Sequence, residues 1–487
     1  MNFEKEIETA LISNNALIYI CTEEEERLEY ILKHRIHHMF QGKICSWNFI
    51  DGYTDNPNYI SKCIQNPLEA LNTTTKYNNK KTKVFFLKDF HVFLQDISIS
   101  RKLKNLYKYL SKNNQYIILS GAKITLPIEL REYIIYLQMP LPNKQEILIE
   151  INRFLYKKSI DKLKYKETIC MAYTGFSINR IRKSLSKIIL NNISKNQIIE
   201  NILQEKEKII QTTEGLKFYS SNNNILEVGG LQHLKHWLKI RNLAFTQKAN
   251  SYGIKRPKGI LIVGIQGTGK SLSAKTISNI WKIPLFRLDV SKIFASILGE
   301  SENRIEKVIN TCEKNSPCIL WIDEIDKIFS EYSTNNDSGT KQRVTNIFLT
   351  WLSEKKQEVF IVATANTINQ LPIEILRKGR FDEIFFIDLP NFKARLKIFQ
   401  IHLKTFRPMT WNKYNIYYLS KISKGFSGAE IEQSIIDAMY TGFYNNREFT
   451  TIDIKNAIKI IVPLSKIERK KILGLRRWGY SGKIKIA

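Results

Sequence analysis

Short, uninterrupted apolar runs recur along both halves of the chain, and each is followed by polar or charged residues. Runs of this length, bounded in this way, are typical of strands that are buried on both faces of a parallel sheet. The runs are residues 16–20, 84–87 and 116–119 in the first half and residues 259–263, 318–322 and 359–364 in the second. The pattern therefore predicts an α/β fold built on parallel sheets.

The run at residues 259–263 leads into a glycine-rich loop. The loop reads Gly264-Ile265-Gln266-Gly267-Thr268-Gly269-Lys270-Ser271 and fits the pattern G-x-x-x-x-G-K-[ST]. Glycines in such a loop let backbone N–H groups surround phosphate oxygens at the N-terminus of a helix, where the helix dipole favours negative charge. The pattern predicts nucleotide binding, with Lys270 on the β- and γ-phosphates and Ser271 on Mg²⁺. ATP and Mg²⁺ are therefore the expected cofactors, with a glycine-rich turn as the alternative for the bare pattern.

Two carboxylates follow the next strand-like run. Residues 318–322 lead directly into Asp323 and Glu324, and open α/β sheets bind ligands at the carboxyl ends of their strands. We predict that Asp323 holds Mg²⁺ and that Glu324 orients and polarises the attacking water, because positioning and charge neutralisation supply most of the catalysis in phosphoryl transfer. A surface acidic pair after a core strand is the alternative interpretation.

Further polar residues follow the third run. Asn366 stands at its end, where a neutral amide can hydrogen-bond both the γ-phosphate and the water, although asparagine after a strand is also a common turn former. Arg377 and Arg380 lie further along, in Leu376-Arg377-Lys378-Gly379-Arg380-Phe381-Asp382. Guanidinium groups stabilise phosphoryl charge bidentately. The two arginines are therefore candidates for arginine fingers that act on a neighbouring subunit's nucleotide.

In this order, the motifs resemble those of the AAA ATPases. The resemblance rests on Val228-Gly229-Gly230-Leu231, the glycine-rich loop, Asp323-Glu324, Asn366, Arg377-x-x-Arg380-Phe381-Asp382 and Gly425-Phe426-Ser427-Gly428-Ala429-Glu430-Ile431, and it covers roughly residues 222–480. It implies a nucleotide-binding subdomain in which helices flank a parallel sheet, followed by a helical lid that begins near Asn391. It also implies a homo-oligomeric ring, a hexamer, with the active site between subunits.

The resemblance also implies roles for individual residues. Val228 and Gly229 would border the adenine, and Gly428 and Ala429 would close over the nucleotide from the lid, while the two arginines would act in trans. One position departs from the pattern: Ile297 stands where many protein-threading members carry an aromatic residue. An aliphatic side chain lacks the flat area and the cation–π option of a ring. The sequence therefore leaves open whether a protein substrate is threaded or levered.

The first half repeats short motifs of the second half in the same order. Leu126-Pro127-Ile128-Glu129-Leu130 recurs as Leu371-Pro372-Ile373-Glu374-Ile375, and Gly175-Phe176-Ser177 recurs as Gly425-Phe426-Ser427. The strand-like runs upstream correspond as well. We therefore predict that the first half is a degenerate copy of the AAA-like α/β fold, with an unrelated α/β topology as the alternative.

This first half lacks the residues for nucleotide chemistry. Its first strand-like run is followed by Thr22-Glu23-Glu24-Glu25-Glu26-Arg27, which contains no glycine. Like charges at close range repel by roughly several kcal/mol at an effective dielectric near 20, so we expect no triphosphate to bind there. Lys88 replaces the acid pair and leaves only Asp89, and no arginine pair follows Leu130. The first half is expected to serve as a packing platform or a partner-binding surface.

Length and composition fit this plan, since the 487 residues are 43% hydrophobic and 25% charged, as in globular proteins with sizeable cores. The predicted division is a degenerate AAA-like domain at residues 1–210, a linker at 211–224, the nucleotide-binding α/β subdomain at 225–390 and a helical lid with a basic tail at 391–487. The linker is placed where Thr212, Gly215 and the Ser- and Asn-rich residues 220–224 interrupt the periodic pattern.

The net charge of +29 would attract polyanions such as nucleic acid. However, lysine far outnumbers arginine, and lysine, asparagine and isoleucine are plentiful together, as AT-rich coding produces without selection for binding. The basic residues are also spread along the chain rather than gathered in one block. The favoured function is an ATPase that hydrolyses ATP between subunits to remodel a protein partner. The alternative is a nucleotide-gated scaffold or a nucleic-acid-associated regulator with slow turnover.

No apolar stretch approaches the roughly 20 residues that cross a bilayer, and the acidic first residues do not resemble a secretory signal. We therefore expect a soluble protein with no membrane partner. In length, layout and composition the whole chain resembles an AAA protein encoded by red-algal plastid genomes and by cyanobacteria. That resemblance implies the plastid stroma, or the cytoplasm of a cyanobacterium, as the location.

Overall fold

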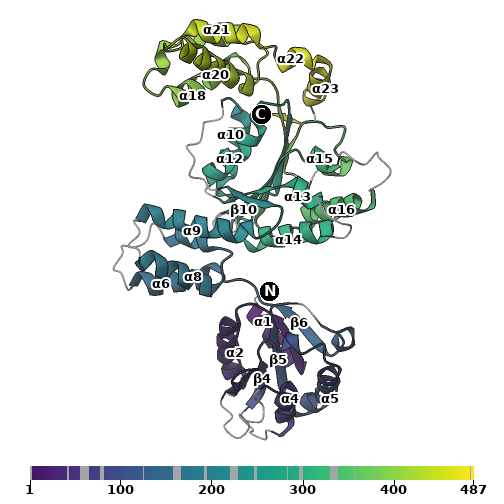
Figure 1. Ribbon diagram of the computed structural model, residues 1–487. Helices are drawn as coiled ribbons and strands as arrows, with labels where there is room; N and C mark the ends of the chain where they lie inside the picture. The colour runs from purple at the N-terminus through teal and green to yellow at the C-terminus, as the bar shows by residue number, and fades with distance from the viewer. Residues whose placement is uncertain are drawn as a thin grey trace. The chain divides into compact units, whose positions relative to one another are not determined.

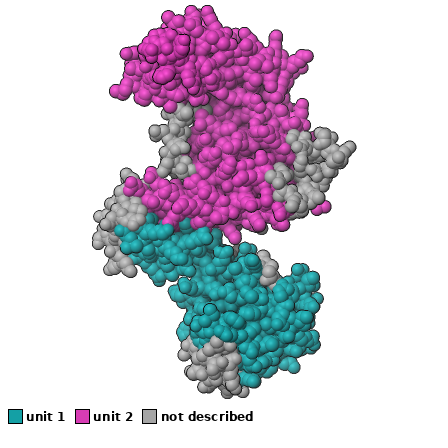
Figure 2. Space-filling view, in the orientation of Figure 1, with its two compact units in different colours: residues 1–161, 176–190 teal, residues 162–175, 191–487 magenta. Residues whose placement is uncertain are grey.

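The computed structural model of the chain divides into two compact units (Figure 2). Unit 1 comprises residues 1–161 and 176–190, and unit 2 comprises residues 162–175 and 191–487. The structure describes residues 3–40, 43–54, 65–76, 82–123, 126–156, 166–190, 195–219, 229–245, 249, 251–281, 283–294, 300–329, 338–355, 357–377, 379–482 and 484–487.

Unit 1 contains a six-stranded sheet with the strand order β3-β2-β4-β5-β1-β6. Neighbouring strands are parallel except for β2 and β3, which are antiparallel. The strands are β1 (Leu17–Cys21), β2 (Lys43–Asn48), β3 (Gly52–Tyr53), β4 (Thr82–Leu87), β5 (Tyr116–Gly121) and β6 (Ile134–Gln138).

Helices cover both faces of this sheet (Figure 1). Alternate residues of a strand point to opposite faces, so Leu17 and Tyr19 of β1 enter a core with α4 and α5, whereas Ile18 and Ile20 enter a core with α1 and α2. Burial on both faces explains the uninterrupted apolar runs of the sequence. The helices of unit 1 are α1 (Phe3–Ile12), α2 (Glu25–Phe40), α4 (Pro67–Lys76), α5 (Ile97–Asn113), α6 (Lys144–Tyr156) and α8 (Ile178–Leu190).

Unit 2 contains a seven-stranded sheet with the order β13-β12-β8-β11-β10-β9-β7. Its neighbouring strands are parallel except for β7 and β9. The strands are β7 (Leu216–Tyr219), β8 (Gly259–Gly264), β9 (Leu285–Leu288), β10 (Cys318–Ile322), β11 (Val359–Ala365), β12 (Glu383–Ile387) and β13 (Lys485–Ile486).

The two faces of the unit 2 sheet pack against different helices. One face shares its core with α14 and α16, and the other shares its core with α10 and α12. The helices of this part are α7 (Lys166–Tyr173), α9 (Lys195–Gln211), α10 (Gln232–Arg241), α12 (Lys270–Trp281), α13 (Val290–Phe294), α14 (Glu300–Lys314), α15 (Asp326–Phe329), α16 (Ser338–Glu354) and α17 (Ile373–Leu376).

A helical lid with its own hydrophobic core follows the sheet. It contains α18 (Phe392–Phe406), α19 (Ile416–Ile422), α20 (Gly428–Tyr444) and α21 (Thr451–Ile460). Asn391 caps α18 by accepting a hydrogen bond from the backbone N–H of Ala394 at 2.9 Å, and Ser427 caps α20 in a capping box with Glu430. These caps fix where the two helices begin.

The last residues, the basic tail of the expected lid-and-tail segment at residues 391–487, return from the lid to the sheet. Helices α22 (Leu464–Ile467) and α23 (Arg469–Gly479) lead to β13, which pairs with β12. Ile472 and Leu475 of α23 pack against Phe386 of β12. The basic tail therefore has one apolar face, with residues three apart, and this face holds it on the sheet.

The two sheets share their strand order. Unit 1 reads β6-β1-β5-β4-β2 where unit 2 reads β12-β8-β11-β10-β9, and in both an antiparallel strand follows at that edge. Unit 1 thus has the AAA-like α/β fold that the repeated motifs predicted. A correction concerns the predicted linker at residues 211–224, because residues 216–219 form β7. Leu216 and Phe218 are buried and Lys217 is exposed, and this alternation over four residues was too short a signal.

Candidate nucleotide-binding site

The candidate site begins at the carboxyl end of β8, where residues 265–269 connect the strand to α12. Gly267 and Gly269 have φ angles of 73° and 90°, in the left-handed region that favours glycine. Gly264 lies against β12, because a Cβ at this position would come within 2.2 Å of the Ile387 carbonyl oxygen. The glycines of the motif are therefore required both by the backbone conformation and by the close packing of two strands.

Lys270 opens α12 and is almost completely buried, at 7% exposed. Its Nζ donates hydrogen bonds to the carbonyl oxygens of Gly264 and Ile265 at 2.7 and 2.8 Å. Burial lowers the pKa of Lys270 to about 8, although nearby carboxylates act in the opposite direction. The loop therefore holds a lysine ammonium that is charged at neutral pH and only sparingly solvated.

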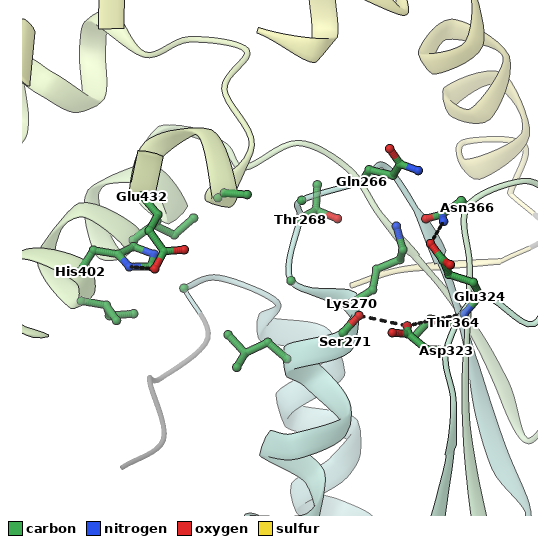
Figure 3. A pocket seen from close by; sticks show the side chains of 18 residues that line it. Gln266, Thr268, Lys270, Ser271, Asp323, Glu324, Thr364, Asn366, His402 and Glu432 are labelled. Atoms are coloured by element: carbon green, nitrogen blue, oxygen red, sulfur yellow. Dashed lines mark hydrogen bonds and ion pairs between the residues drawn. The ribbon is translucent and has the colours of Figure 1, made fainter. Parts of the chain in front are cut away.

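Asp323 directly follows β10 and is held through both carboxylate oxygens. Ser271 Oγ and Thr364 Oγ1 donate to Asp323 Oδ1 at 3.0 and 2.7 Å (Figure 3). Arg287, on the adjacent strand β9, pairs with Asp323 Oδ2 at 3.2 Å. The hydroxyl of Ser271 and the carboxylate of Asp323 thus form a pair of neighbouring hard oxygen donors.

Glu324 is also held on two sides. Asn366 Nδ2 donates to Glu324 Oε1 at 3.0 Å, and Lys327 Nζ pairs with Oε2 at 2.5 Å. The hydrogen bond from Lys327 is the main cause that lowers the pKa of Glu324. Its backbone has a φ of 52°, which is rare for a residue with a side chain, and its N–H donates to Thr364 Oγ1 at 3.0 Å. Glu324 is therefore a fixed, ionised carboxylate.

A cavity of about 440 Å³ lies between the glycine-rich loop, the carboxyl ends of β10 and β11, and the lid (Figure 3). The lid contributes Ile398, Ile401 and His402 from α18 and Gly428, Ala429 and Glu432 from α20. His402 Nδ1 lies 3.5 Å from Glu432 Oε1, so the two lid helices meet at this wall. The backbone N–H of Ala429 donates to the Gly267 carbonyl oxygen at 3.1 Å, which joins the lid to the loop.

The structure brings most of the residues predicted from the sequence around this cavity. Those that line it are Gly229, Gln266, Gly267, Thr268, Gly269, Lys270, Ser271, Asp323, Glu324, Asn366, Gly428 and Ala429. Gly264 and Ile265 form the base of the loop beneath the lysine side chain. Val228 and Ile297 lie outside the described residues.

Arg377 and Arg380 do not line the cavity of their own chain. Arg377 is exposed, whereas Arg380 is half-buried and its Nη1 has no hydrogen-bond partner among the described residues. The segment that carries them is anchored by Asp382, whose Oδ2 accepts hydrogen bonds from the backbone N–H groups of Lys258 and Gly259 at 2.6 and 2.9 Å. The two guanidinium groups therefore lie on a fixed segment outside their own cavity.

Sequence reasoning missed four polar residues of the site. They are Thr364, Arg287, His402 and Glu432. Thr364 was counted as part of an apolar strand, although it is a polar residue next to the carboxyl end of β11. Arg287 is a charged residue within the otherwise apolar strand β9, at the same sheet edge. A charge at such a position could have indicated a functional residue. The pair from the lid has no local motif, because α18 and α20 bring it together from distant parts of the sequence.

A glycine-rich loop, an acid pair and an amide on three neighbouring parallel strands, covered by a helical lid, define a P-loop ATPase module. Residues 260–389 match the family described as "ATPase family associated with various cellular activities (AAA)". Residues 3–139 match the "SpoVK-like AAA ATPase, N-terminal domain". The chain belongs to the AAA family of ATPases.

Two ycf46 proteins match over the full length of the chain, and a nucleotidase matches over part of it. The uncharacterized AAA domain-containing protein ycf46 of Gracilaria tenuistipitata var. liui is 50% identical over 490 residues, which cover 100% of both chains. The ycf46 protein of Guillardia theta is 47% identical over 495 residues, covering 100% of this chain and 97% of that protein. The proteasome-activating nucleotidase of Saccharolobus islandicus (strain Y.N.15.51 / Yellowstone #2) is 30% identical over 284 residues, or 56% of this chain and 71% of the nucleotidase.

Within the described part of the chain, no helix has the length and apolar character needed to span a membrane.

Proposed function

We propose that unit 2 binds Mg-ATP in the cavity and hydrolyses it between the subunits of a homo-oligomeric ring, a hexamer, in order to remodel a protein partner. One observation carries the proposal: an ammonium, a hydroxyl, two carboxylates and an amide from separate elements converge on a single cavity (Figure 3). Membership of the AAA family supports ATP hydrolysis as the reaction.

The described residues fit a nucleoside triphosphate. The loop provides backbone N–H groups at the N-terminus of α12, next to the Lys270 ammonium, and both favour an anion. A Cβ at Gly267 would lie 2.9 Å from Ser427 Oγ and 3.2 Å from the Ala429 Cβ, so glycine keeps the space between loop and lid open. Ile398 and Ile401 give this end of the cavity an apolar wall that suits the flat face of an adenine, with Gly229 beside it.

Ser271 and Asp323 would hold Mg²⁺, since hydroxyl and carboxylate oxygens are the ligands this ion prefers. When bound, the ion supplies charge neutralisation on the phosphates. The hydroxyl of Thr364 fixes the orientation of Asp323 through the 2.7 Å hydrogen bond. The Asp323 carboxylate is therefore already ordered before Mg²⁺ binds. The role proposed for Asp323 therefore depends on a buried threonine as well as on its own charge.

Glu324 would orient and polarise the water that attacks the γ-phosphate. The hydrogen bond from Lys327 lowers the pKa of this carboxyl further below neutral pH, where it is ionised in any case, and the hydrogen bond from Asn366 fixes one of its oxygens. Asn366 also lines the cavity, where its amide can contact the γ-phosphate without adding charge. Positioning of this kind supplies most of the rate enhancement in phosphoryl transfer.

Arg377 and Arg380 are proposed to complete the site of a neighbouring subunit. Neither lines the cavity of its own chain, and Arg377 is exposed, so its guanidinium is accessible to a neighbouring subunit. Arginine can place two parallel hydrogen bonds on a phosphoryl group. An arginine that arrives from another subunit would couple hydrolysis to assembly of the ring.

The proposed partner is a protein, because the chain is 30% identical over 284 residues to a proteasome-activating nucleotidase. We place the protein in the plastid stroma, on the similarity to algal ycf46 proteins over the full length. The test is a Glu324→Gln chain loaded with Mg-ATP and recovered together with its bound proteins. A Lys270→Ala chain is the matched control, since it should carry no nucleotide.

We expect specific proteins to be enriched with the Glu324→Gln chain and absent from the control. Recovery of the same proteins with both chains, or of none, would reject a nucleotide-dependent protein partner and favour the nucleotide-gated scaffold. Recovery of nucleic acid, with affinity that falls steeply as salt rises, would favour the regulator instead.

A further inference from the structure

The shared strand order gives the nucleotide site a counterpart in unit 1, at the carboxyl end of β1. In unit 2, residues 265–269 join β8 to α12, whereas in unit 1 residues 22–24 join β1 to α2. The shorter connection contains no glycine. It therefore cannot surround a phosphate group with backbone N–H groups as the glycine-rich loop does.

Hydrogen bonds show which residues of the two sheets correspond. Asp89 follows β4 with a φ of 50° and donates its N–H to Ser120 Oγ at 3.4 Å. Glu324 follows β10 with a φ of 52° and donates its N–H to the Thr364 hydroxyl at 3.0 Å. Asp89 is therefore the counterpart of Glu324, and Ser120 is the counterpart of Thr364.

This correspondence reverses two charges. Lys88, one residue before Asp89, stands where unit 2 has Asp323, and Glu25 begins α2 as Lys270 begins α12. Unit 1 therefore has an acid where the ATPase site has its lysine, and a lysine where it has the acid expected to hold Mg²⁺. The counterpart site in unit 1 therefore differs from the ATPase site in the charges of its side chains as well as in the loss of its glycines.

The Glu25 carboxylate occupies the space between the ends of β4 and β5. Its Oε1 accepts a hydrogen bond from Ser120 Oγ at 2.6 Å and another from the backbone N–H of Asp89 at 3.0 Å. Ser120 is fully buried. An anion is thus already bound to the polar groups at this sheet edge, and it belongs to the chain itself.

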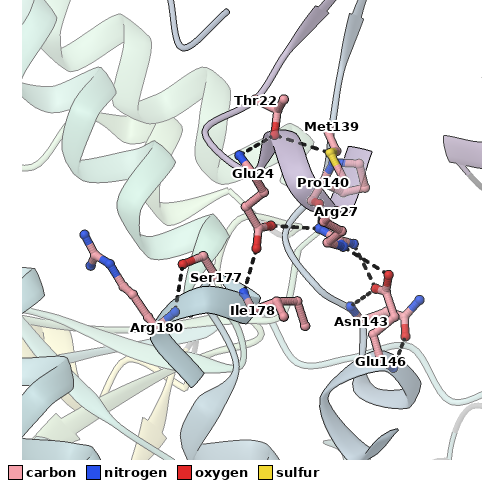
Figure 4. A network of polar contacts seen from close by, with 10 residues as sticks. All are labelled: Thr22, Glu24, Arg27, Met139, Pro140, Asn143, Glu146, Ser177, Ile178 and Arg180. Carbon is pink, nitrogen blue, oxygen red and sulfur yellow. Dashed lines mark hydrogen bonds and ion pairs between the residues drawn. The ribbon is translucent and has the colours of Figure 1, made fainter. Parts of the chain in front are cut away.

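The Glu24 carboxylate lies at the N-terminus of α8 (Figure 4). Its Oε1 accepts the backbone N–H of Ile178 at 2.6 Å, and its Oε2 pairs with Arg27 Nη1 at 2.9 Å. Glu24 is 7% exposed. Helix α8 follows Gly175-Phe176-Ser177, the segment that repeats the residues before α20 of the ATPase lid. Glu24 therefore binds the counterpart of the lid helix that borders the nucleotide cavity.

Arg27 extends this connection to a second helix. Its guanidinium donates to both carboxylate oxygens of Glu146, at 3.1 and 2.8 Å, and to the Pro140 carbonyl oxygen at 2.8 Å (Figure 4). Glu146 lies in the first turn of α6, which follows Leu141-Pro142-Asn143, just as α18 follows Leu389-Pro390-Asn391. The chain from Glu24 through Arg27 to Glu146 thus ties both lid-like helices to the connection between β1 and α2.

We propose that unit 1 is a permanently closed copy of the AAA fold, in which Glu24 and Glu25 take the place of the phosphate groups of a nucleotide. The acidic run does more than repel phosphate, because two of its carboxylates are already paired with the donors of this site. The lid-like helices of unit 1 accordingly hold their position with or without ATP. The conformational response to ATP is confined to unit 2.

The test is hydrogen exchange of backbone amides in the full chain, with and without Mg-ATP. In the wild type, the amide of Ile178 should exchange slowly and at the same rate in both conditions. Glu24→Ala removes a charge-assisted hydrogen bond, so exchange at the start of α8 should accelerate about 10- to 100-fold. Glu23→Ala is the matched control, because Glu23 is the exposed neighbour in the same acidic run, and it should leave the rate unchanged.

Equal exchange rates in Glu24→Ala and Glu23→Ala would overturn the proposal, and so would slower exchange of α8 on addition of ATP. If Glu24→Ala does not fold, Glu24→Gln keeps the shape and one oxygen acceptor, and it should show a smaller acceleration in the same direction. The start of α20 reports separately on the proposed function. If its exchange does not respond to ATP, nucleotide binding by unit 2 is rejected. The comparison of Glu24→Ala with Glu23→Ala in the absence of nucleotide still tests whether unit 1 is a closed copy.

Discussion

Replacing Thr364 by valine tests how the acidic edge of the ATPase site is organised. Thr364 is fully buried near the end of β11. Its hydroxyl donates to Asp323 Oδ1 at 2.7 Å and accepts the Glu324 N–H at 3.0 Å. Valine has nearly the same shape but no hydroxyl group, so Thr364→Val removes both hydrogen bonds with little change in packing.

The expected magnitude follows from these two bonds. A hydrogen bond to a charged group contributes about 1.5–3 kcal/mol, and a buried N–H left without an acceptor costs about 1–3 kcal/mol. Since the two effects share one hydroxyl and do not add fully, the free energy of unfolding of unit 2 should fall by roughly 2–4 kcal/mol. Loss of the fixed orientation of Asp323 and Glu324 should reduce kcat by about 10- to 100-fold, or about 1.4–2.8 kcal/mol of transition-state stabilisation.

The assays are denaturant unfolding followed by tryptophan fluorescence and phosphate release at saturating Mg-ATP. Thr364→Ser is the matched control, because serine keeps the hydroxyl and loses one methyl group, at a cost of about 1 kcal/mol. It should retain most of the turnover. Valine and serine variants that match in both stability and kcat would refute the hydrogen-bonding role of Thr364.

Four other predictions concern the same site. Lys270→Ala should abolish ATP binding in equilibrium titrations. Binding with unchanged affinity would contradict the proposed role of Lys270 in the site. Because burial lowers the pKa of Lys270 to about 8, ATP affinity should fall as the pH rises through about 8, whereas Lys270→Arg, which keeps its charge, should lose much less affinity over that range. Between about pH 8 and 10.4, Lys270 has lost its proton in the folded, nucleotide-free protein but keeps it in the unfolded chain. The contribution of this lysine to the free energy of unfolding of unit 2 should therefore increase as the pH rises through this range, and thermal unfolding would show the change. Arg377→Ala should cut turnover with little change in ATP affinity, and mixing it with Glu324→Gln subunits should restore part of the activity; no recovery in mixed rings would contradict action in trans.

The sequence was sufficient to predict the sheets because their central strands are buried on both faces. Leu17, Ile18 and Tyr19 of β1 are all fully buried, so the run is apolar without interruption and stands out. Strand β7 was missed since it has four residues and one exposed face. Strand β13 has two exposed residues, and its place depends on the packing of α23 against β12, which no local pattern records.

The site was predictable where its chemistry is local in the sequence. The glycines and Lys270 follow each other in one loop, and the carboxylates of Asp323 and Glu324 end one strand. The wall formed by His402 and Glu432 requires two lid helices to meet. Its members are ordinary helix residues until the lid folds, so sequence reasoning had no reason to select them.

The central claim is that Mg-ATP binds in the unit 2 cavity and is cleaved with help from Glu324. The most direct measurement is the rate of γ-phosphate release from pre-bound Mg-ATP, in a single turnover, for the wild type and for Glu324→Gln. We predict that the variant retains ATP with nearly unchanged affinity and releases phosphate at least about 100-fold more slowly, since glutamine keeps the hydrogen bond with Asn366 but cannot polarise the water. Release at the wild-type rate would contradict the role of Glu324, and a wild-type chain that retains no ATP with Mg²⁺ present would contradict the proposed function as a whole.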